Sequence, residues 1–158
     1  NRRGLQLGLH ALVGSANASS LTAIYLIDLD GFKPINDTHG HDAGDELLIK
    51  MGERLKSAVR TGDLVARLGG DEFVVVASQL RGEAEAEQVG HKLLACTESD
   101  FQLTDTTCHV GMTVGYAVAP LDGSDADALV RRADNAMYGG KQAGKNRVRR
   151  ATEMPAES

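Results

Sequence analysis

The chain has 158 residues, of which 42% are hydrophobic and 25% are charged, a composition typical of one globular domain with a single core. Its formal net charge of -5 gives no electrostatic reason to expect a nucleic-acid partner. Two cysteines, Cys96 and Cys108, are too few for a disulfide-stapled secreted scaffold, and no apolar run approaches the ~20 residues of a membrane span. We therefore expect neither nucleic-acid binding nor direct membrane contact in this segment.

The first clear element is the stretch LTAIYLIDLD at residues 21–30. It is almost continuously apolar until Asp28, which predicts a strand that is buried on both faces at the centre of a sheet. The turn-rich stretch GFKPINDTHGHDAGD follows at residues 31–45. Beyond it, apolar residues from Leu47 to Val59 recur at helical spacing and predict a helix that packs on the sheet.

A hairpin, a helix and a strand are predicted next. The segments LVARL and FVVVA flank Gly-Gly-Asp-Glu at residues 69–72, whose glycines favour a tight turn. Residues 83–97 place acids first and apolar residues on one side, the pattern of a helix. Residues 108–118 alternate between apolar and smaller or polar side chains, which predicts a half-buried strand with room for a close neighbour at Gly111 and Gly115.

In the last part of the chain, a cap-like Ser124 or Asp125 predicts the start of a further helix, which runs through Met137 and stops at Gly139 and Gly140. Residues 141–150 then form a basic tail. The order strand, helix, hairpin, helix, strand, helix predicts an α+β sheet with helices on one side, because a hairpin makes the sheet antiparallel in part.

We expect one domain over residues 1–150 and a loose C-terminal tail or linker over residues 151–158. Because the chain begins at Asn1 rather than at a methionine, we expect a fragment of a longer multidomain protein. The sparse, unpaired cysteines favour a reducing compartment, which predicts a cytoplasmic location.

Three acids could share one site. Asp28 ends the apolar strand, and Asp71 and Glu72 lie on the hairpin turn that could pack beside it. Neighbouring carboxylates repel unless a cation compensates them, and the hard, oxygen-preferring ions Mg²⁺ and Mn²⁺ suit such a set. The alternative is that Asp28 is a strand-end turn former and that the other two acids are solvated loop tips. Both interpretations stay open on these residues alone.

The segment GGKQAGKN carries Lys141 and Lys145, which could bind phosphates. It is not a P-loop, because Asn146 stands where a hydroxyl belongs and the segment follows a helix instead of a strand. A glycine cap followed by solvated lysines is the alternative. His39 and His41 lack the spacing of a helical zinc motif, and we expect them to make hydrogen bonds in a turn.

Four ordered motifs together resemble the GGDEF family of bacterial diguanylate cyclases. The matching segments are Asn1-Arg2-Arg3, DLDGFKPINDTHGHDAGD at 28–45, RLGGDEF at 67–73 and ADNAMYGGKQAGKNRV at 133–148. The resemblance covers nearly the whole chain. It implies a palm-like nucleotidyl cyclase fold, in which helices flank a central, mostly antiparallel sheet. The Gly-Gly-Asp-Glu segment would form the turn of a β-hairpin in this sheet.

The resemblance also implies that the domain condenses two GTP molecules into cyclic di-GMP and releases two pyrophosphates. Each domain would hold one GTP, so turnover would require a face-to-face homodimer. Two Mg²⁺ or Mn²⁺ ions would lie in each active site and stabilise charge that develops on the phosphates. Their implied ligands are the carboxylates of Asp28, Asp71 and Glu72 and the backbone carbonyl of Leu29. Asp71 and Glu72 would be catalytic, and Glu72 would either bind metal or help deprotonate the attacking 3′-hydroxyl.

Nucleotide recognition is implied at further positions. Asn36 and Asp45 match the residues that read guanine, and their amide and carboxylate suit its donor and acceptor edge. Gly69 and Gly70 would let the backbone approach the nucleotide. The β- and γ-phosphates would be neutralised by three lysines: Lys33, Lys141 and Lys145.

Arg60 and Asp63 match the family's RxxD inhibitory site, where cyclic di-GMP would bind and inhibit its own synthesis. An alternative is a non-catalytic regulatory module that binds GTP or cyclic di-GMP, although the complete Gly-Gly-Asp-Glu-Phe signature favours the enzyme. A cyclase with a mixed or single-nucleotide product is a third possibility, against which Asn36 and Asp45 argue. The bacterial family implies a cytoplasmic domain, which could belong to a larger, membrane-attached sensor.

Overall fold

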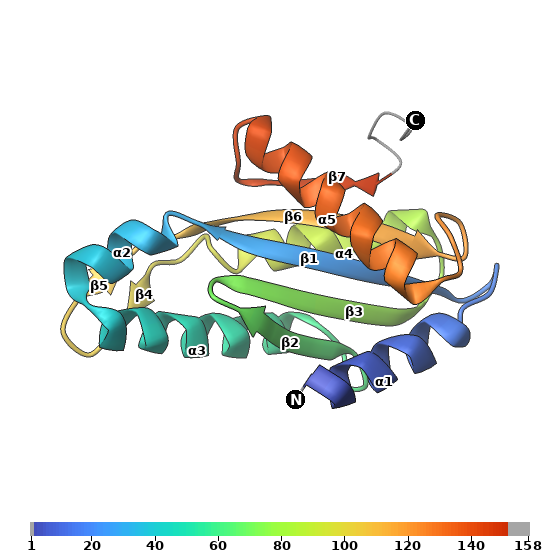
Figure 1. Cartoon of the computed structure of the whole chain (residues 1–158), viewed down its shortest axis with the longest axis horizontal. Coiled ribbons are helices and arrows are strands. Elements are labelled where there is room, and N and C mark those ends of the chain that lie inside the picture. The colour runs from blue at the N-terminus through green and yellow to red at the C-terminus, as the bar shows by residue number, and fades with distance from the viewer. Residues whose placement is uncertain (1, 152–158) are drawn as a thin grey trace.

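The computed structural model describes residues 2–151 and has a five-stranded sheet at its centre (Figure 1). In the order in which they lie side by side, its strands are β2 (Leu64–Gly69), β3 (Glu72–Leu80), β1 (Leu21–Asp30), β6 (Gly111–Ala119) and β7 (Arg147–Arg150). Neighbouring strands are antiparallel except β6 and β7, which are parallel. The predicted α+β class and mostly antiparallel sheet are confirmed.

Helices accompany the sheet along the described part of the chain. They are α1 (Arg2–Gly14), α2 (Phe32–His39), α3 (His41–Ala58), α4 (Glu83–Ala95) and α5 (Ala126–Gln142). Two short strands, β4 (Phe101–Gln102) and β5 (Thr107–Cys108), form a separate sheet. None of the helices within residues 2–151 is long and apolar enough to cross a membrane.

Strand β1 is the middle strand of the sheet, as its sequence predicts. It pairs with β3 on one side and with β6 on the other. Its odd-numbered residues from Leu21 to Leu29 belong to one apolar cluster, whereas Ile24 and Leu26 belong to a second. Because both faces of the sheet are covered here, the strand needs an apolar residue at almost every position.

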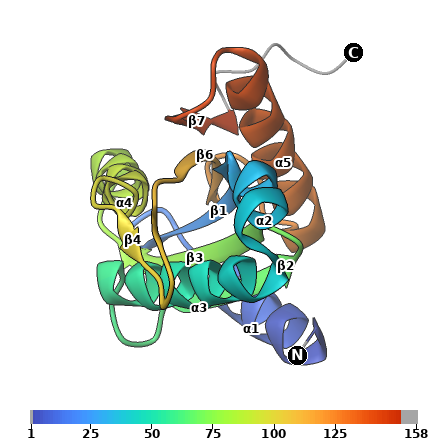
Figure 2. The ribbon, with the colours of Figure 1, turned by 90° about the vertical axis from the view of Figure 1, so that its left-hand side faces the viewer.

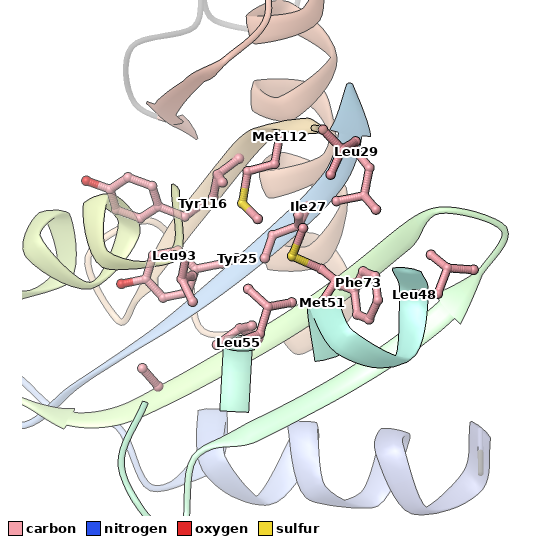
Figure 3. Close-up of a cluster of buried hydrophobic side chains, with 14 of the residues drawn as sticks. Tyr25, Ile27, Leu29, Leu48, Met51, Leu55, Phe73, Leu93, Met112 and Tyr116 are labelled. Carbon is pink, nitrogen blue, oxygen red and sulfur yellow. The ribbon is translucent and has the colours of Figure 1, made fainter. Parts of the chain in front are cut away.

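Helices α3 and α4 cover the face that carries the first cluster (Figure 2). Figure 3 shows Met51 and Leu55 of α3 in this cluster, together with Tyr25 of β1 and Leu93 of α4. Tyr25 stacks on Tyr116 of β6, with ring centroids 5.2 Å apart. Its hydroxyl donates a hydrogen bond of 2.5 Å to the carbonyl of Ala86, which ties α4 to the centre of the sheet.

Helices α1 and α5 cover the opposite face (Figure 2). Buried residues of both helices belong to the second cluster, among them Leu9, Val13, Leu129, Ala133 and Met137. The predicted placement of all helices on one side is therefore wrong. Strands with apolar residues on both faces need a helical layer on each side to keep those residues from water.

Helix α5 lies directly against β6 at Gly115. A Cβ atom added there would be 2.1 Å from the backbone nitrogen of Met137 and 2.3 Å from the carbonyl oxygen of Ala133, which confirms the predicted close neighbour. At Gly111 the nearest atom, on Asp30, is at an ordinary 3.5 Å. The strand is not half-buried as predicted, because α4 and α5 pack on its two faces.

Two other local predictions were wrong. The expected turn at residues 31–45 contains α2 and the start of α3, which are separated by Gly40 at φ +92°. The basic tail contains β7, which was not predicted because its pairing partner, β6, lies far away in the sequence. Helix α1 was not predicted either. Of the residues expected to form a loose tail, 152–158 lie outside the described part of the chain.

Helix α5 also extends beyond its predicted end. Gly139 and Gly140 lie inside the helix, which continues to Gln142. At Gly140 an added Cβ would be 2.8 Å from a methyl carbon of Thr113 on β6, so the glycine allows close packing and does not end the helix. Gly144, at φ +127°, follows the true end. Lys141 therefore lies in the last helical turn, not after it.

Candidate active site

The end of β1 and the turn between β2 and β3 bring the predicted acids to one edge of the sheet. Asp28 is the pairing partner of Glu72 across the β1–β3 ladder. One residue further on, the amide of Leu29 donates a 3.2 Å hydrogen bond to the carbonyl of Asp71. The antiparallel register of two strands thus places three acidic residues close together, although 43 positions separate Asp28 from Asp71 in the sequence.

The carboxylate of Asp28 lacks a complete set of partners. Its Oδ1 atom is buried without a hydrogen bond, while Oδ2 lies 3.5 Å from the Nζ atom of Lys141. The pKa of Asp28 is raised to about 6 from its usual 3.8, mainly by burial; Asp71 adds to this shift and Lys141 opposes it. A buried acid next to a second acid is a setting that favours an additional cation.

Glu72 experiences a similar environment. Burial is the main cause that raises its pKa, and repulsion from Asp134 of α5 and from Asp71 adds to it, while Lys141 opposes the shift. Asp134 was not among the predicted site residues, because the link between α5 and β3 exists only in the fold. Several acids, among them Glu72, Asp71 and Asp134, therefore surround Lys141.

The donor set suits a hard cation more than a transition metal. Within residues 2–151, no group of three or more His, Cys, Asp or Glu side chains is arranged as a ready metal cluster. What the site offers is the unpartnered oxygen of Asp28 beside Asp71, and oxygen-only donors are those that Mg²⁺ and Mn²⁺ prefer. The Leu29 carbonyl, predicted as a ligand, accepts a 3.4 Å hydrogen bond from Lys141.

Gly69 and Gly70 are needed for the shape of the hairpin turn. Their φ angles are +149° and +52°, in a region that other residues rarely adopt, and a Cβ added at either position would meet no atom within 4 Å. The Nε atom of Arg67 donates a 3.0 Å hydrogen bond to the carbonyl of Gly70, which holds the turn. The space around both glycines is open, so a ligand can approach this backbone.

The two predicted guanine-reading residues come from adjacent helices. Asn36 lies in α2, and its amide carbonyl packs against Gly44 of α3, where an added Cβ would be 2.2 Å away. Its amide nitrogen lies 3.0 Å from Nδ1 of His41. Asp45, the residue after Gly44, is exposed. The short gap between the helices therefore brings Asn36 and Asp45 to neighbouring positions.

A groove of about 600 Å³ begins at Asp45 and runs between α3 and the hairpin. Leu48 and Gly52 contribute from α3, and Arg67 and Phe73 contribute from β2 and β3. Apolar side chains, among them Leu48 and Phe73, form part of its lining, and the charged lining residues are Asp45, Glu53, Lys56 and Arg67. Apolar lining with a few polar groups is typical of a site for a planar, hydrogen-bonding ligand.

The three predicted phosphate-binding lysines differ in their surroundings. Lys141 is largely buried, with a side-chain exposure of 19%, and lies next to Asp28 and Asp30. Lys145 is exposed and has a left-handed backbone at φ 64°. Lys33 is exposed in the first turn of α2. Of the three lysines, Lys141 is the one that ion pairs with acids of the site hold in a defined position.

Sequence reasoning missed Asp30, the last residue of β1. Its carboxylate accepts hydrogen bonds from the hydroxyl of Thr113 at 2.9 and 3.0 Å and from the backbone amide of Asn146 at 2.9 Å. It also forms a 2.6 Å ion pair with Lys141. The DLD sequence placed this acid two residues from Asp28, but its partners lie 83 to 116 positions away.

The predicted inhibitory pair lies at the other end of the hairpin. Asp63 precedes β2 and accepts hydrogen bonds from the amides of Arg60, at 3.0 Å, and Ser78, at 3.2 Å. The guanidinium of Arg60 donates to the carbonyl of Ser78 at 2.8 Å and lies 3.6 Å from the carboxylate of Glu85. These contacts bring the two residues together beside α4.

A pocket of about 230 Å³ adjoins this pair. It is lined by Arg60 and Asp63, by Arg81 before α4, and by Glu85 and Lys92 of α4. Three cationic side chains around a small pocket form a setting that attracts an anion. Glu85 opposes this attraction, because it lies 3.6 Å from both arginines.

Comparison with known proteins agrees with this geometry. The family model described as "Diguanylate cyclase, GGDEF domain" matches residues 1–147. The bifunctional diguanylate cyclase/cyclic di-GMP phosphodiesterase MucR of Pseudomonas aeruginosa is 40% identical over 124 residues, which cover 78% of this chain and 18% of MucR. The chain spans 16% to 30% of the lengths of the first four curated relatives.

Solved structures show the same fold. The crystal structure of the GGDEF domain of TpbB, also called YfiN, from Pseudomonas aeruginosa matches with a TM-score of 0.90 at 36% identity, over 95% of this chain and 94% of that one. A second match is the structure of a microbial GGDEF domain that shows a novel mode of interaction with cyclic di-GMP. It has a TM-score of 0.80 at 33% identity, over 95% of this chain and 90% of that one.

Proposed function

Because the chain belongs to the GGDEF family of diguanylate cyclase domains, we propose that it condenses two GTP molecules into cyclic di-GMP with release of two pyrophosphates. The observation that carries this proposal is the closeness of the Asp28 and Asp71 carboxylates, with a buried oxygen of Asp28 left without a hydrogen bond. Acids used only as turn formers would be hydrated and need no cation.

The family implies two Mg²⁺ or Mn²⁺ ions, and the buried oxygen of Asp28 beside Asp71 supports a cation at this site. Asp28, Asp71 and Glu72 would supply carboxylate oxygens, and the Leu29 carbonyl, which also accepts a 3.4 Å hydrogen bond from Lys141, would assist. When bound, the ions would supply charge stabilisation on the triphosphate. Carboxylates must be deprotonated to bind metal, so the raised pKa of Asp28 predicts weaker metal binding below about pH 6.

Asn36 and Asp45 would read the guanine edge at the mouth of the groove. The carboxylate accepts from the N1 and amino groups of guanine, whereas adenine would leave these protein groups unpaired. The apolar side chains of Leu48 and Phe73 would accommodate the base. Lys33, Lys141 and Lys145 would bind the phosphates.

Glu72 is the candidate for proton transfer from the 3′-hydroxyl. Burial and neighbouring acids raise its pKa, and a carboxylate with a raised pKa is a stronger base. One chain supplies one nucleotide site, so two chains facing each other would be needed to form both phosphodiester bonds. Much of the rate enhancement would then come from the oriented encounter of two bound nucleotides.

The curated relatives are several times longer than this chain. We therefore propose that the domain works as the catalytic part of a longer signalling protein in the bacterial cytoplasm. Cyclic di-GMP would also bind at Arg60 and Asp63 and inhibit synthesis, a role that the cationic lining of the adjoining pocket supports.

The direct test is to incubate the purified domain at high concentration with GTP and Mg²⁺ and to separate the products by chromatography. Analytical ultracentrifugation of the same sample measures the dimer. We expect cyclic di-GMP and pyrophosphate in a ratio of one to two, because each product molecule releases two pyrophosphates. A dimeric sample that binds GTP without forming cyclic di-GMP would refute the enzyme and support the regulatory module.

The matched variants are Asp71→Asn and Asp127→Asn. Asp71→Asn should abolish turnover, because an amide keeps the shape of the turn but cannot balance a cation. Asp127 lies in the first turn of α5 with a side-chain exposure of 63%, and its carboxylate lies 3.9 Å from the ring of His10. Its substitution should leave turnover unchanged, and equal turnover in all three proteins would overturn the assignment of Asp71.

A further inference from the structure

The carboxylate of Asp30 joins three separate parts of the molecule. It is 11% exposed and pairs with Lys141 in the last turn of α5 at 2.6 Å. The hydroxyl of Thr113 on β6, which is fully buried, donates to both of its oxygens. The backbone amide of Asn146, in the loop after α5, donates to Oδ2 at 2.9 Å.

These contacts determine where the ammonium group of Lys141 lies. Its Nζ atom has three N–H donors and lies 2.6 Å from Asp30, 3.4 Å from the Leu29 carbonyl and 3.5 Å from Asp28. The contact with Asp30 is the shortest of the three. A flexible lysine loses side-chain entropy when it is fixed, and the ion pair with Asp30 fixes it before any ligand binds.

Asp30 also supports the loop that carries Lys145. Lys145 and Asn146 both have left-handed backbones, at φ 64° and 49°. Non-glycine residues are strained in this region, so neighbouring contacts are needed to hold two of them in succession. The amide of Asn146 bonds to Asp30, and the amide of Lys145 bonds to the Gly140 carbonyl at 3.0 Å.

We propose that Asp30 is a positioning residue, which holds Lys141 and the loop at Lys145 in the arrangement that receives the phosphates of the nucleotide. The proposal rests on the proposed function, since that function assigns both lysines to phosphate. Asp30 itself touches no substrate atom in this account. It acts through Lys141 by an ion pair and through Lys145 by the backbone of the loop.

Removal of Asp30 would have two opposing effects on phosphate binding. An acid at 2.6 Å neutralises part of the charge of Lys141, so its removal would strengthen phosphate binding if charge alone mattered. Positioning dominates here because Asp28 lies only 3.5 Å from the same ammonium group. Without Asp30, Lys141 would move toward Asp28 and away from the phosphates, so binding becomes weaker.

The test is a double-mutant cycle with Asp30→Asn, Lys141→Gln and the double variant, in which calorimetry measures binding of a non-hydrolysable GTP analogue. Asn keeps the size of Asp and one acceptor for the loop amide but loses the ion pair. We expect about tenfold weaker binding for Asp30→Asn, which corresponds to about 1.4 kcal/mol. The double variant should bind no more weakly than Lys141→Gln alone, because Asp30 acts through Lys141.

Steady-state kinetics separates positioning from a general loss of structure. For Asp30→Asn we expect the KM for GTP to rise about tenfold while kcat changes less than about threefold. A purely structural role would lower the active fraction, and hence the apparent kcat, with KM unchanged. Thr113→Val, which has nearly the same shape, provides a second variant if Asp30→Asn folds poorly, and it should weaken analogue binding several-fold.

Additive effects in the cycle, or tighter binding by Asp30→Asn, would overturn the proposal. Asp127→Asn is the matched control and should bind the analogue as the unmodified chain does. If the unmodified chain binds the analogue but makes no cyclic di-GMP, the proposed function fails while the cycle still decides the role of Asp30. If the unmodified chain does not bind the analogue, both proposals fail.

Discussion

At Asp28, a buried carboxylate oxygen without a hydrogen-bond partner lies close to a second carboxylate, that of Asp71. Such an arrangement destabilises a protein that has no bound cation, because burial and repulsion both disfavour the charged form. The neighbouring Lys141 compensates only in part, since the pKa of Asp28 stays near 6. The same features that make the acid costly in the folded chain make it a good ligand for a divalent ion.

This cost predicts that Asp28→Asn stabilises the metal-free protein. The folded pKa of about 6 lies above the usual 3.8, so the acid favours folding only while it is protonated, and this contribution is lost as the pH rises from about 4 to about 6. With a chelator present at pH 7.5, we expect the free energy of unfolding to increase by about 1 kcal/mol, after allowance for partial solvation. Urea unfolding measures it.

The pH dependence supplies the control. The difference between the two proteins should be near zero at pH 4, grow up to about pH 6 and stay constant above it, because Asn does not titrate. Asp127→Asn should show no comparable pH-dependent difference, since Asp127 is exposed. A stability difference that is the same at pH 4 and pH 7.5 would contradict the account of Asp28.

The candidate site also shows which residues can be predicted from sequence. Asp28, Asp71 and Lys141 belong to short motifs, so their resemblance to a known family identified them. Thr113 belongs to none, and it joins the site only because β6 pairs with β1 and places it opposite Asp28. Asp30 lay inside a motif, but its role depends on contacts that no local pattern contains.

At the scale of elements, local patterns predicted β1, the hairpin and α4, because alternation, turn glycines and helical spacing act over a few residues. The predicted end of α5 was wrong because that boundary depends on contacts with a distant part of the chain. A pair of glycines normally ends a helix, but Gly140 fits against Thr113 of β6 and lets the helix continue. Long-range packing decided that boundary, and it placed Lys141 on a rigid helix.

The contact at Gly115 fixes the position of α5 and hence that of Lys141. Gly115→Ala should destabilise the chain by about 2 kcal/mol or more, because the added methyl would overlap the α5 backbone at Met137 and Ala133. We also expect weaker nucleotide binding as α5 moves outward. Urea unfolding and calorimetry with the GTP analogue measure the two effects.

Gly14→Ala is the control for this prediction. Gly14 is the last residue of α1, and a Cβ added there would meet no atom within 4 Å. Its substitution should leave stability unchanged or raise it slightly, because alanine is the better helix former. If both variants were equally stable, α5 would not be held against β6 as described.

At the scale of the whole molecule, the hairpin joins the candidate active site to the candidate inhibitory site. Its turn carries Gly69 and Gly70, and Arg60 and Asp63 lie before the start of β2. The six residues of β2 span about 20 Å, so a ligand at one end does not touch the other. Inhibition would have to act through the hairpin or through the pairing of two chains.

The position of Glu85 makes a specific prediction about this inhibition. Its carboxylate lies 3.6 Å from Arg60 and 3.6 Å from Arg81, and it is 28% exposed. It therefore competes with any anionic product for both guanidinium groups. Glu85→Gln should strengthen inhibition by cyclic di-GMP about two- to fivefold, the range expected from the loss of a partly exposed ion pair.

Turnover measured at increasing concentrations of added cyclic di-GMP tests this prediction, with three variants that differ at one charged position each. Arg60→Ala should keep turnover but lose inhibition, because the guanidinium that receives the product is gone. Glu87→Gln is the matched control, since Glu87 lies on the same helix and contacts His91 at 3.6 Å. Weaker inhibition in Glu85→Gln would instead mean that Glu85 orients Arg60 for the product, and equal inhibition in Arg60→Ala and the unmodified chain would remove the inhibitory site from this pocket.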